Sequence, residues 1–444
     1  MKHSSANVKL FSYFIILAIF GSLMLQIPWA YVSGDAVPYI DSLFTAVSAL
    51  CVTGLSTVSM DVYTTFGLSI IMFLIEAGGL GVLTFISLIL SLSSRKVSLV
   101  NRKLIKDYFI DDVDSSPRRI LKSIIMYTII IQTCGALLLM PFLKNIGEPL
   151  WIFYSFFFAV SAFCNAGFSP YSTSLLKFEN NPYPLIIIML LIVLGGLGFL
   201  VIKNILQIIR KKTDHLYLHS KIVIFMTSVL ILSGAAVVFF TERNKALAGF
   251  PVWKQLTISF FQSITTRTAG FEVVPQAEFS APVLLYNIIL MFVGGSSGSI
   301  AGGVKTTTAF IAILYVLNGN EEKHIINIGN RQIDPSLVNK SISIISRSVL
   351  LLFISMLILS ITESVAIADH SIWISDIMFE VVSAFGTVGL SQGITGILTT
   401  GGKIVIILTM FIGRTGIFAM TLHITNKNKN EFNIQYPTER ILLG

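Results

Sequence analysis

The chain has 444 residues, of which 54% are hydrophobic and 12% are charged, and its mean hydropathy is +0.80. Apolar stretches of about 20 residues recur along it, enough to cross a hydrocarbon core of roughly 30 Å, so we expect an integral membrane protein and not a soluble one. The net charge of +8 comes without basic sequence interleaved with aromatic residues, which excludes a nucleic-acid surface, and the three cysteines show neither disulfide nor metal-ligand spacing.

The positions of the basic residues predict the topology. Most of the 31 Lys and Arg residues fall in five polar segments, at 1–10, 91–122, 203–221, 316–347 and 425–444. The positive-inside rule places these segments, and therefore both termini, in the cytoplasm. The first apolar run, Leu10 to Ile27, could be a signal peptide. It is long, lacks a small-x-small cleavage site after it and has similar segments downstream, so a retained first helix is favoured.

The first quarter of the chain contains a short apolar run between two expected spans, near 10–29 and 66–92. This run, Phe44 to Leu50, is too short to cross a bilayer and is typical of a half-helix, with extended backbone expected over Cys51 to Gly54. The same order of elements returns three times, around Gly167, Gly270 and Gly389. The expected spans and short runs lie near 120–142, 151–163 and 185–209, then 222–240, 256–265 and 282–317, then 348–368, 374–385 and 403–425.

The four short runs share sequence features that predict tandem repeats. A Phe stands ten residues before each Gly, and a Ser stands six before it in three copies, with Ile264 in the third. The Phe residues are Phe44, Phe157, Phe260 and Phe379, and the Ser residues are Ser48, Ser161 and Ser383. Two crossings per unit give all four units one orientation, which excludes inverted repeats. We therefore expect an all-α membrane protein with eight transmembrane helices and four re-entrant segments around one pseudo-fourfold pore.

The expected organisation follows from these units. Repeats 1 to 4 occupy 1–92, 120–210, 222–317 and 348–425, and repeat 3 contains an irregular loop at 294–308. Cytoplasmic linkers occupy 93–119, 211–221 and 318–347, and a cytoplasmic tail occupies 426–444.

The residues beside the four glycines predict an ion site. Irregular backbone at membrane depth is tolerated where it lines a wet cavity, and a ring of carbonyls can replace the hydration shell of a monovalent cation. No Asp or Glu lies within the four segments, and the short helices point their partly negative C-termini inward, which favours cations. The alternative is a set of glycine-containing helix ends packed in a bundle. The predicted ion ligands, through backbone carbonyls, are Val52, Thr53, Gly54, Asn165, Ala166, Gly167, Thr268, Ala269, Gly270, Thr387, Val388 and Gly389.

The second span of the third unit is interrupted by a Gly- and Ser-rich stretch. Eight of the ten residues from Gly294 to Gly303 are Gly or Ser, so a helix there would cost several kcal/mol on propensity alone. We expect a loop, the alternative being a helix kink for packing. The resemblance of Gly298 to Thr306 to a Walker motif is weak, because Val304 intrudes before the Lys and no strand precedes it.

Several charged residues stand in or beside apolar sequence. Arg414 lies mid-span and is a functional candidate by default, with a packing salt bridge to Glu76 or Glu363 as the alternative. Arg267 precedes the third glycine segment, where support of the filter backbone is favoured over ion contact. Lys305 could neutralise carbonyls or face the cytoplasm.

Two aspartates recur at one position of the repeat. Asp41 and Asp376 both lie thirteen residues before their glycines. That position predicts a negative N-cap on the short helix, with a minor role in attracting cations.

The four glycine segments, above all Thr266–Phe271, together with the loop 294–308 and Arg414, resemble the Trk/Ktr/HKT superfamily of potassium transporters, and most closely its bacterial Ktr membrane subunits. The resemblance covers essentially the whole chain. It implies potassium selectivity from four filter glycines, a gate loop that obstructs the pore, and an arginine at the pore as electrostatic barrier or loop anchor. The gate positions it implies are Gly294, Gly295, Ser296, Ser297, Gly298, Gly302, Gly303, Lys305 and Arg414.

The resemblance also implies a setting. The chain would be the potassium-translocating subunit of a Ktr-type uptake system in a bacterial plasma membrane, surrounded by lipid and possessing no bound cofactor. It would work as a homodimer, with residues 441–443 as a dimer contact, on a cytoplasmic nucleotide-binding ring of KtrA or KtrC type, with sodium-stimulated uptake. Alternatives are a sodium-selective or weakly selective transporter and a non-conducting structural or sensory subunit. An enzyme is disfavoured, because the spans carry no carboxylate pair, Ser/His pair or metal-ligand cluster.

Overall fold

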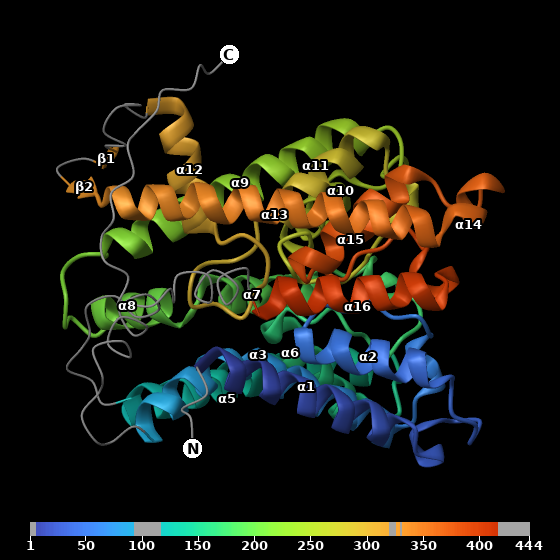
Figure 1. Ribbon diagram of the computed structural model, residues 1–444. Helices are drawn as coiled ribbons and strands as arrows, with labels where there is room; N and C mark the ends of the chain where they lie inside the picture. Colours follow the sequence, from blue (N-terminus) through green and yellow to red (C-terminus); the bar gives the residue numbers. More distant parts are fainter. Residues whose placement is uncertain (1–5, 93–116, 319–325, 329–330, 416–444) are drawn as a thin grey trace, which may run out of the picture.

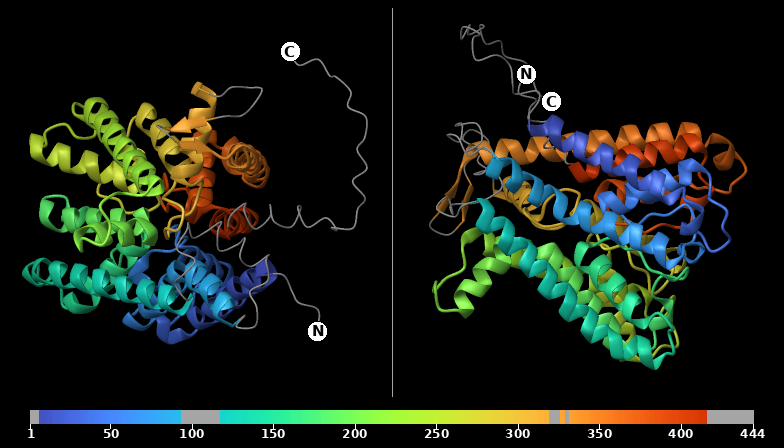
Figure 2. Two further views of the ribbon diagram at one scale, coloured as in Figure 1. Left: turned by 90° about the vertical axis from the view of Figure 1, so that its left-hand side faces the viewer. Right: turned by 90° about the horizontal axis from the view of Figure 1, so that it is seen from below.

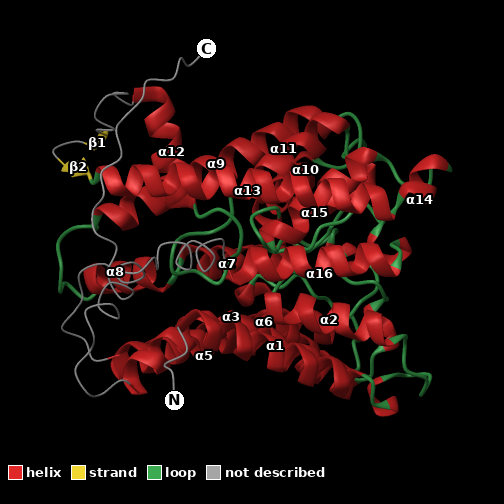
Figure 3. Cartoon of the chain, in the orientation of Figure 1, coloured by secondary structure: helices red, strands yellow, loops and turns green. Residues whose placement is uncertain are grey.

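The computed structural model describes residues 6–92, 117–318, 326–328 and 331–415, and confirms the expected helical class (Figures 1 and 3). The helices are α1 (Ala6–Leu25), α2 (Tyr39–Cys51), α3 (Thr65–Leu92), α5 (Pro117–Asn145), α6 (Trp151–Cys164), α7 (Pro182–Leu197), α8 (Phe199–Ile209), α9 (Leu218–Glu242), α10 (Val252–Thr265), α11 (Ala281–Phe292), α12 (Thr306–Asn318), α13 (Pro335–Thr362), α14 (Ser364–Ala368), α15 (Ile374–Gly386) and α16 (Thr400–Thr415). Short 3-10 helices are η1 (Pro28–Ala30), η2 (Met60–Val62), η3 (Leu176–Phe178), η4 (Gln276–Glu278) and η5 (Thr395–Ile397). Strands β1 (Ile326–Ile328) and β2 (Arg331–Ile333) pair antiparallel.

The helices are grouped around a centre filled by loops. In the left view of Figure 2 the colours follow one another around the molecule in sequence order, from blue through green and yellow to orange and red. Four short helices, α2, α6, α10 and α15, pack between the longer ones: α2 against α1 and α3, for example, and α6 against α5 and α7. Each has 13 or 14 residues, about 20 Å at 1.5 Å per residue, which is shorter than a hydrocarbon core.

Fewer helices reach span length than the eight expected. Within the described residues three helices are long and apolar enough to cross a membrane, at Leu121–Asn145, Leu218–Glu242 and Pro335–Thr362. The pair α7 and α8 makes a fourth if it is one span bent by 102°. The apolar parts of α1, α3, α11 and α12 fall below this length.

Two helix boundaries differ from the sequence expectation for identifiable reasons. Helix α13 begins at Pro335, earlier than Ser348, because Asp334 caps it by accepting the Ser336 N–H at 2.9 Å and Pro335 occupies the first turn. The expected span 185–209 breaks at Gly198, whose φ of +83° lies outside the helical region. Hydropathy identifies apolar sequence, and it detects neither the cap at Asp334 nor the change of backbone conformation at Gly198.

Candidate functional site

Four tight turns, each ending in a glycine, meet at the centre of the molecule. We call residues 52–54, 165–167, 268–270 and 387–389 the glycine turns. A Cβ atom added to each glycine would clash with the carbonyl oxygen of the residue before the glycine in the following turn. The distance from the added Cβ atom to that carbonyl oxygen is 2.4 Å for Gly54 and Ala166, and 2.7 Å for Gly167 and Ala269. It is 2.2 Å both for Gly270 and Val388 and for Gly389 and Thr53. The last contact returns to the first turn, so the four turns form a closed ring.

The backbone of the turns repeats as well. The residue two before each glycine is left-handed, with φ of 57° at Val52, 57° at Asn165, 71° at Thr268 and 50° at Thr387. The glycines have φ between 70° and 97°, where a side chain is unfavourable. Extended backbone was expected from Cys51 to Gly54 and is wrong in detail. Cys51 is still helical, and Val52 is a left-handed helix cap.

Hydroxyl groups near the ends of the short helices hold three of the turns directly. Ser48 Oγ accepts the Gly54 N–H, and Ser383 Oγ accepts the Gly389 N–H, each at 3.1 Å. In the second turn Ser161 Oγ donates to the Phe168 carbonyl at 2.8 Å. These bonds tie the backbone of each glycine segment to the helix that precedes it.

The third turn is offset by one residue relative to the sequence alignment. Phe44, Phe157 and Phe379 are fully buried, but Phe260 is 37% exposed and Phe261 takes the buried place. Correspondingly Thr265, and not Ile264, supplies the hydroxyl, which donates to the Phe271 carbonyl at 2.7 Å. In the third segment the buried Phe and the hydroxyl residue therefore stand nine and five residues before the glycine, one fewer than in the other segments, and the expected equivalence of Phe260 and Ile264 is wrong.

Replacing Thr265 with valine tests this offset. The methyl group keeps the shape but leaves the buried Phe271 carbonyl without a donor, which we expect to destabilise the fold by about 1–3 kcal/mol. The measurement is thermal unfolding of the detergent-purified chain. Thr257→Val is the matched control, because Thr257 lies on an exposed face of the same helix and bonds only to Trp253. Equal melting temperatures for the two variants would contradict the assignment.

The segment between α11 and α12 is a loop closed at its base. The N–H of Gly294 donates to the Val304 carbonyl at 2.9 Å, and the Val304 N–H to the Phe292 carbonyl at 3.2 Å. The Thr306 N–H donates to the Gly295 carbonyl at 3.1 Å. The tip, with Ser297 and Gly298, is thus a defined excursion.

The loop docks on the bend between α7 and α8. The Ser296 N–H donates to the Gly196 carbonyl at 3.0 Å, and Ser296 Oγ donates to the Leu197 carbonyl at 2.5 Å. The Phe199 N–H donates to the Gly298 carbonyl at 3.3 Å. Backbone groups freed by the break at Gly198 are therefore satisfied by the loop, as a non-aqueous setting requires.

Arg414 ties the loop to a distant helix. Its guanidinium donates to the Ile300 carbonyl of the loop and, at 2.6 Å, to the Gly78 carbonyl of α3. The expected alternative of a salt bridge to Glu76 or Glu363 is wrong, because Glu76 accepts from Gln132 and Glu363 accepts from Thr399. The hydrogen-bond acceptors of Arg414 are main-chain carbonyls, and because every residue has one, the sequence does not indicate which of them Arg414 contacts.

The remaining candidates lie around the ring. Lys305 folds back and donates to the Ala301 carbonyl within the loop. Arg267 is buried and its guanidinium faces Thr227 of α9 at 3.5 Å.

The two aspartates differ from each other. Asp376 is not the N-cap of α15, because Trp373 holds that position; it lies in the first turn and accepts the Trp373 N–H at 2.9 Å. Asp41 is not an N-cap, since Pro38 holds that position. It forms a buried ion pair with Lys403 of α16 at 2.5 Å, because a close cation stabilises a desolvated carboxylate better than a helix end does.

A cavity of about 390 Å³ adjoins the ring, and we call it the vestibule. All four glycines line it, and Glu272 is the one charged residue in its lining. Burial raises the pKa of Glu272 to about 8, with the Ser391 main chain opposing the rise and Glu380 adding to it.

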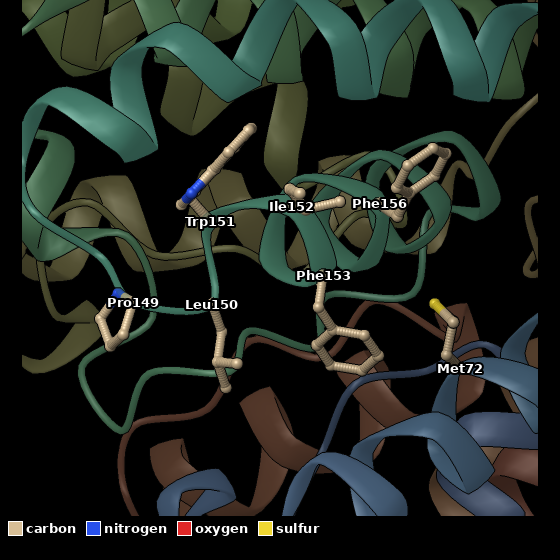
Figure 4. A pocket seen from close by; sticks show the side chains of 7 residues that line it. All are labelled: Met72, Pro149, Leu150, Trp151, Ile152, Phe153 and Phe156. Atoms are coloured by element: carbon tan, nitrogen blue, oxygen red, sulfur yellow. The ribbon is translucent and has the colours of Figure 1, made fainter.

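A larger cavity, of about 460 Å³, lies elsewhere, between α3 and the start of α6 (Figure 4). Its labelled side chains carry no carboxylate, hydroxyl or imidazole that could bind an ion; they are Met72, Pro149, Leu150, Trp151, Ile152, Phe153 and Phe156. In the described part of the chain no group of three or more His, Cys, Asp or Glu could hold a metal ion. The ring of glycine turns, with a carbonyl oxygen of each turn against the glycine of the preceding one, is therefore the chemically distinctive site in the described part of the chain.

The chain is similar to known membrane transport proteins over almost its whole length. The family model TrkH, described as a cation transport protein, matches residues 2–436. The potassium/sodium uptake protein NtpJ of Enterococcus hirae is 37% identical over 435 residues, covering 97% of this chain and 95% of that protein. The Ktr system potassium uptake protein B of Bacillus subtilis is 33% identical over 438 residues, covering 97% and 95%. The crystal structure of the potassium transporter TrkH from Vibrio parahaemolyticus superposes with a TM-score of 0.74 at 18% identity, over 96% of this chain and 86% of that one, and so shares the fold.

Proposed function

The chain belongs to the TrkH family of membrane cation transport proteins and is not an enzyme, and we propose that it is the potassium-translocating membrane subunit of a Ktr-type uptake system. The observation that carries the proposal is the closed ring of glycine turns. The four carbonyls that face the neighbouring glycines belong to Thr53, Ala166, Ala269 and Val388. A dehydrated monovalent cation would be coordinated there by backbone oxygens alone.

The proposed architecture is four tandem repeats with eight crossing helices around one pseudo-fourfold pore. The repeats are 1–92, 120–210, 222–317 and 348–425, and the linkers and tail are cytoplasmic. The vestibule would open to the outside, because the basic polar segments mark the opposite face. Cations would enter through the vestibule, shed water at the ring and continue past the loop.

Potassium is favoured over sodium because all four turns carry glycine, the pattern that goes with potassium in the family. A weakly selective or sodium-conducting transporter is the second candidate, favoured by one finding: the relative from Enterococcus hirae is named for both ions. The pore would hold potassium only through carbonyls, and no cofactor is proposed for this chain.

We propose that the loop 294–308, whose last three residues form the start of α12, is the gate. It is held at both sides, by the bend at Gly198 and by Arg414, so it could shift as a unit when either contact is released. Its control is assigned to a cytoplasmic nucleotide-binding ring under a homodimer of this chain. The proposed dimer contact at 441–443 lies outside the described residues.

Ion flux into liposomes tests the proposal. The purified chain, reconstituted with its cytoplasmic ring, should accumulate potassium, or rubidium as tracer, down an imposed gradient and discriminate against sodium at least about tenfold. Protein-free liposomes and liposomes with the ring alone are the controls. Flux of both ions at equal rates would establish the weakly selective alternative, and no flux of either ion would indicate a non-conducting subunit.

A further inference from the structure

The vestibule breaks the symmetry of the ring at one position. The residue two after each glycine lines it: Ser56, Ser169 and Ser391 in three segments, but Glu272 in the third. One carboxylate therefore stands among three hydroxyls, one step beyond the carbonyl ring.

Glu272 is fixed in place by its two neighbouring segments. Its N–H donates to Ser174 Oγ at 3.0 Å, and its carbonyl accepts the Leu175 N–H at 2.9 Å. The main chain of Ser391 donates to its carboxylate. Glu272 is thus anchored at the wall of the vestibule as a half-buried residue that lines the cavity.

The serine hydroxyls each donate their hydrogen to protein. Ser56 donates to the Val58 carbonyl at 2.5 Å, Ser169 to the Ser174 carbonyl at 2.9 Å, and Ser391 to Glu380 at 2.7 Å. These three serines therefore offer the vestibule no hydrogen, because a hydroxyl has a single one, and each oxygen also accepts a backbone N–H. Glu272 is the one of the four equivalent residues that can bring a charge to the vestibule.

A second carboxyl group lies behind the wall. Glu380 is fully buried and accepts from Ser391 and, at 2.5 Å, from Thr395. In the part of the chain that the structure describes, neither Glu272 nor Glu380 forms an ion pair with a lysine or arginine. Above the raised pKa of Glu272, its ionised carboxylate has no cationic partner beside the open cavity, which favours the uptake of a cation.

We propose that the vestibule is a second cation site, in which Glu272 binds a partly hydrated monovalent cation before it reaches the carbonyl ring. The inference rests on the proposed function for the direction of flow. Selectivity belongs to the ring, where the ion is dehydrated. Glu272 instead raises the occupancy of the entrance, and so sets the apparent affinity.

The test compares Glu272→Gln with Glu278→Gln, which removes an exposed carboxylate from the same post-turn segment. At pH 9, above the pKa of Glu272, and at low ionic strength, Glu272→Gln should raise the KM for potassium roughly three- to tenfold, the effect of one nearby charge at high dielectric. Maximal flux and the potassium-to-sodium ratio should stay unchanged. Glu278→Gln should match the wild type, and an impermeant organic salt should narrow the gap between wild type and Glu272→Gln by screening.

Calorimetric titration of potassium into the detergent-purified chain provides a readout independent of flux. Glu272→Gln should lose a weak binding event that wild type and Glu278→Gln retain, whether or not the chain conducts. Identical KM values and identical titrations would overturn the inference, as would a loss of maximal flux without a change in KM. A wild type that binds potassium in this way but never conducts it would overturn the proposed function alone.

Discussion

Replacing Gly270 with serine is expected to abolish the preference for potassium over sodium and to reduce potassium flux at least about tenfold. A Cβ atom at Gly270 would stand 2.2 Å from the Val388 carbonyl oxygen, so the neighbouring turn must move. That oxygen is one quarter of the proposed coordination ring. A displacement costing only about 1.4 kcal/mol of ion binding already changes occupancy tenfold.

Gly249→Ser is the matched control for this variant. Gly249 has φ of +81°, close to the +79° of Gly270, but a Cβ atom there would meet nothing within 4 Å. Both serines bear the same backbone strain, about 1–2 kcal/mol, and only one touches the ring. The measurement is tracer flux of each cation into liposomes. An unchanged preference in Gly270→Ser would show that selection occurs elsewhere.

The positions of the four glycine turns in the chain could be predicted from the sequence, but not which turn contacts which. Four short apolar runs ending in glycine can be recognised because their length excludes a bilayer crossing. That Gly54 lies against Ala166, and Gly389 against Thr53, depends on packing between segments far apart in the chain. The sequence alignment also misplaced the third helix by one residue, since both Phe260 and Phe261 are phenylalanines and only burial separates them.

The loop and its contacts show a second limit. The Gly- and Ser-rich stretch predicted irregular backbone, because helix propensity is local. The bend at Gly198 was missed, because glycines in an apolar run are compatible with a helix, as Gly195 and Gly196 in α7 are, and here the Ser296 contacts stabilise the break. The partners of Arg414 were missed because a carbonyl acceptor can belong to any residue, whereas the two glutamates were visible in the sequence.

Arg414 yields the second large prediction. Arg414→Gln should raise potassium flux at least about tenfold in liposomes that lack the cytoplasmic ring. The variant loses the charge-assisted hydrogen bonds to the Ile300 and Gly78 carbonyls, each contributing about 1.5–3 kcal/mol. It also removes a positive charge beside the path of a cation. The loop then keeps its contacts at the α7–α8 bend and the packing of Gly302 against Gly386 and Thr387, and Ser296→Ala should add to the effect by removing the bond to Leu197.

Two further variants separate the causes. Arg267→Gln removes a second buried guanidinium, which contacts Thr227 and not the loop, and so it controls for general destabilisation. In liposomes that lack the cytoplasmic nucleotide-binding ring, potassium flux through this variant should stay low. Arg414→Lys keeps the charge, but a single ammonium cannot reproduce the forked contact to two carbonyls on different segments. High flux in Arg414→Lys would identify Arg414 as an anchor, and low flux would identify it as an electrostatic barrier. Low flux in Arg414→Gln, with a melting temperature equal to that of Arg267→Gln, would remove both roles, because neither the charge nor the anchor would then hold the pathway closed.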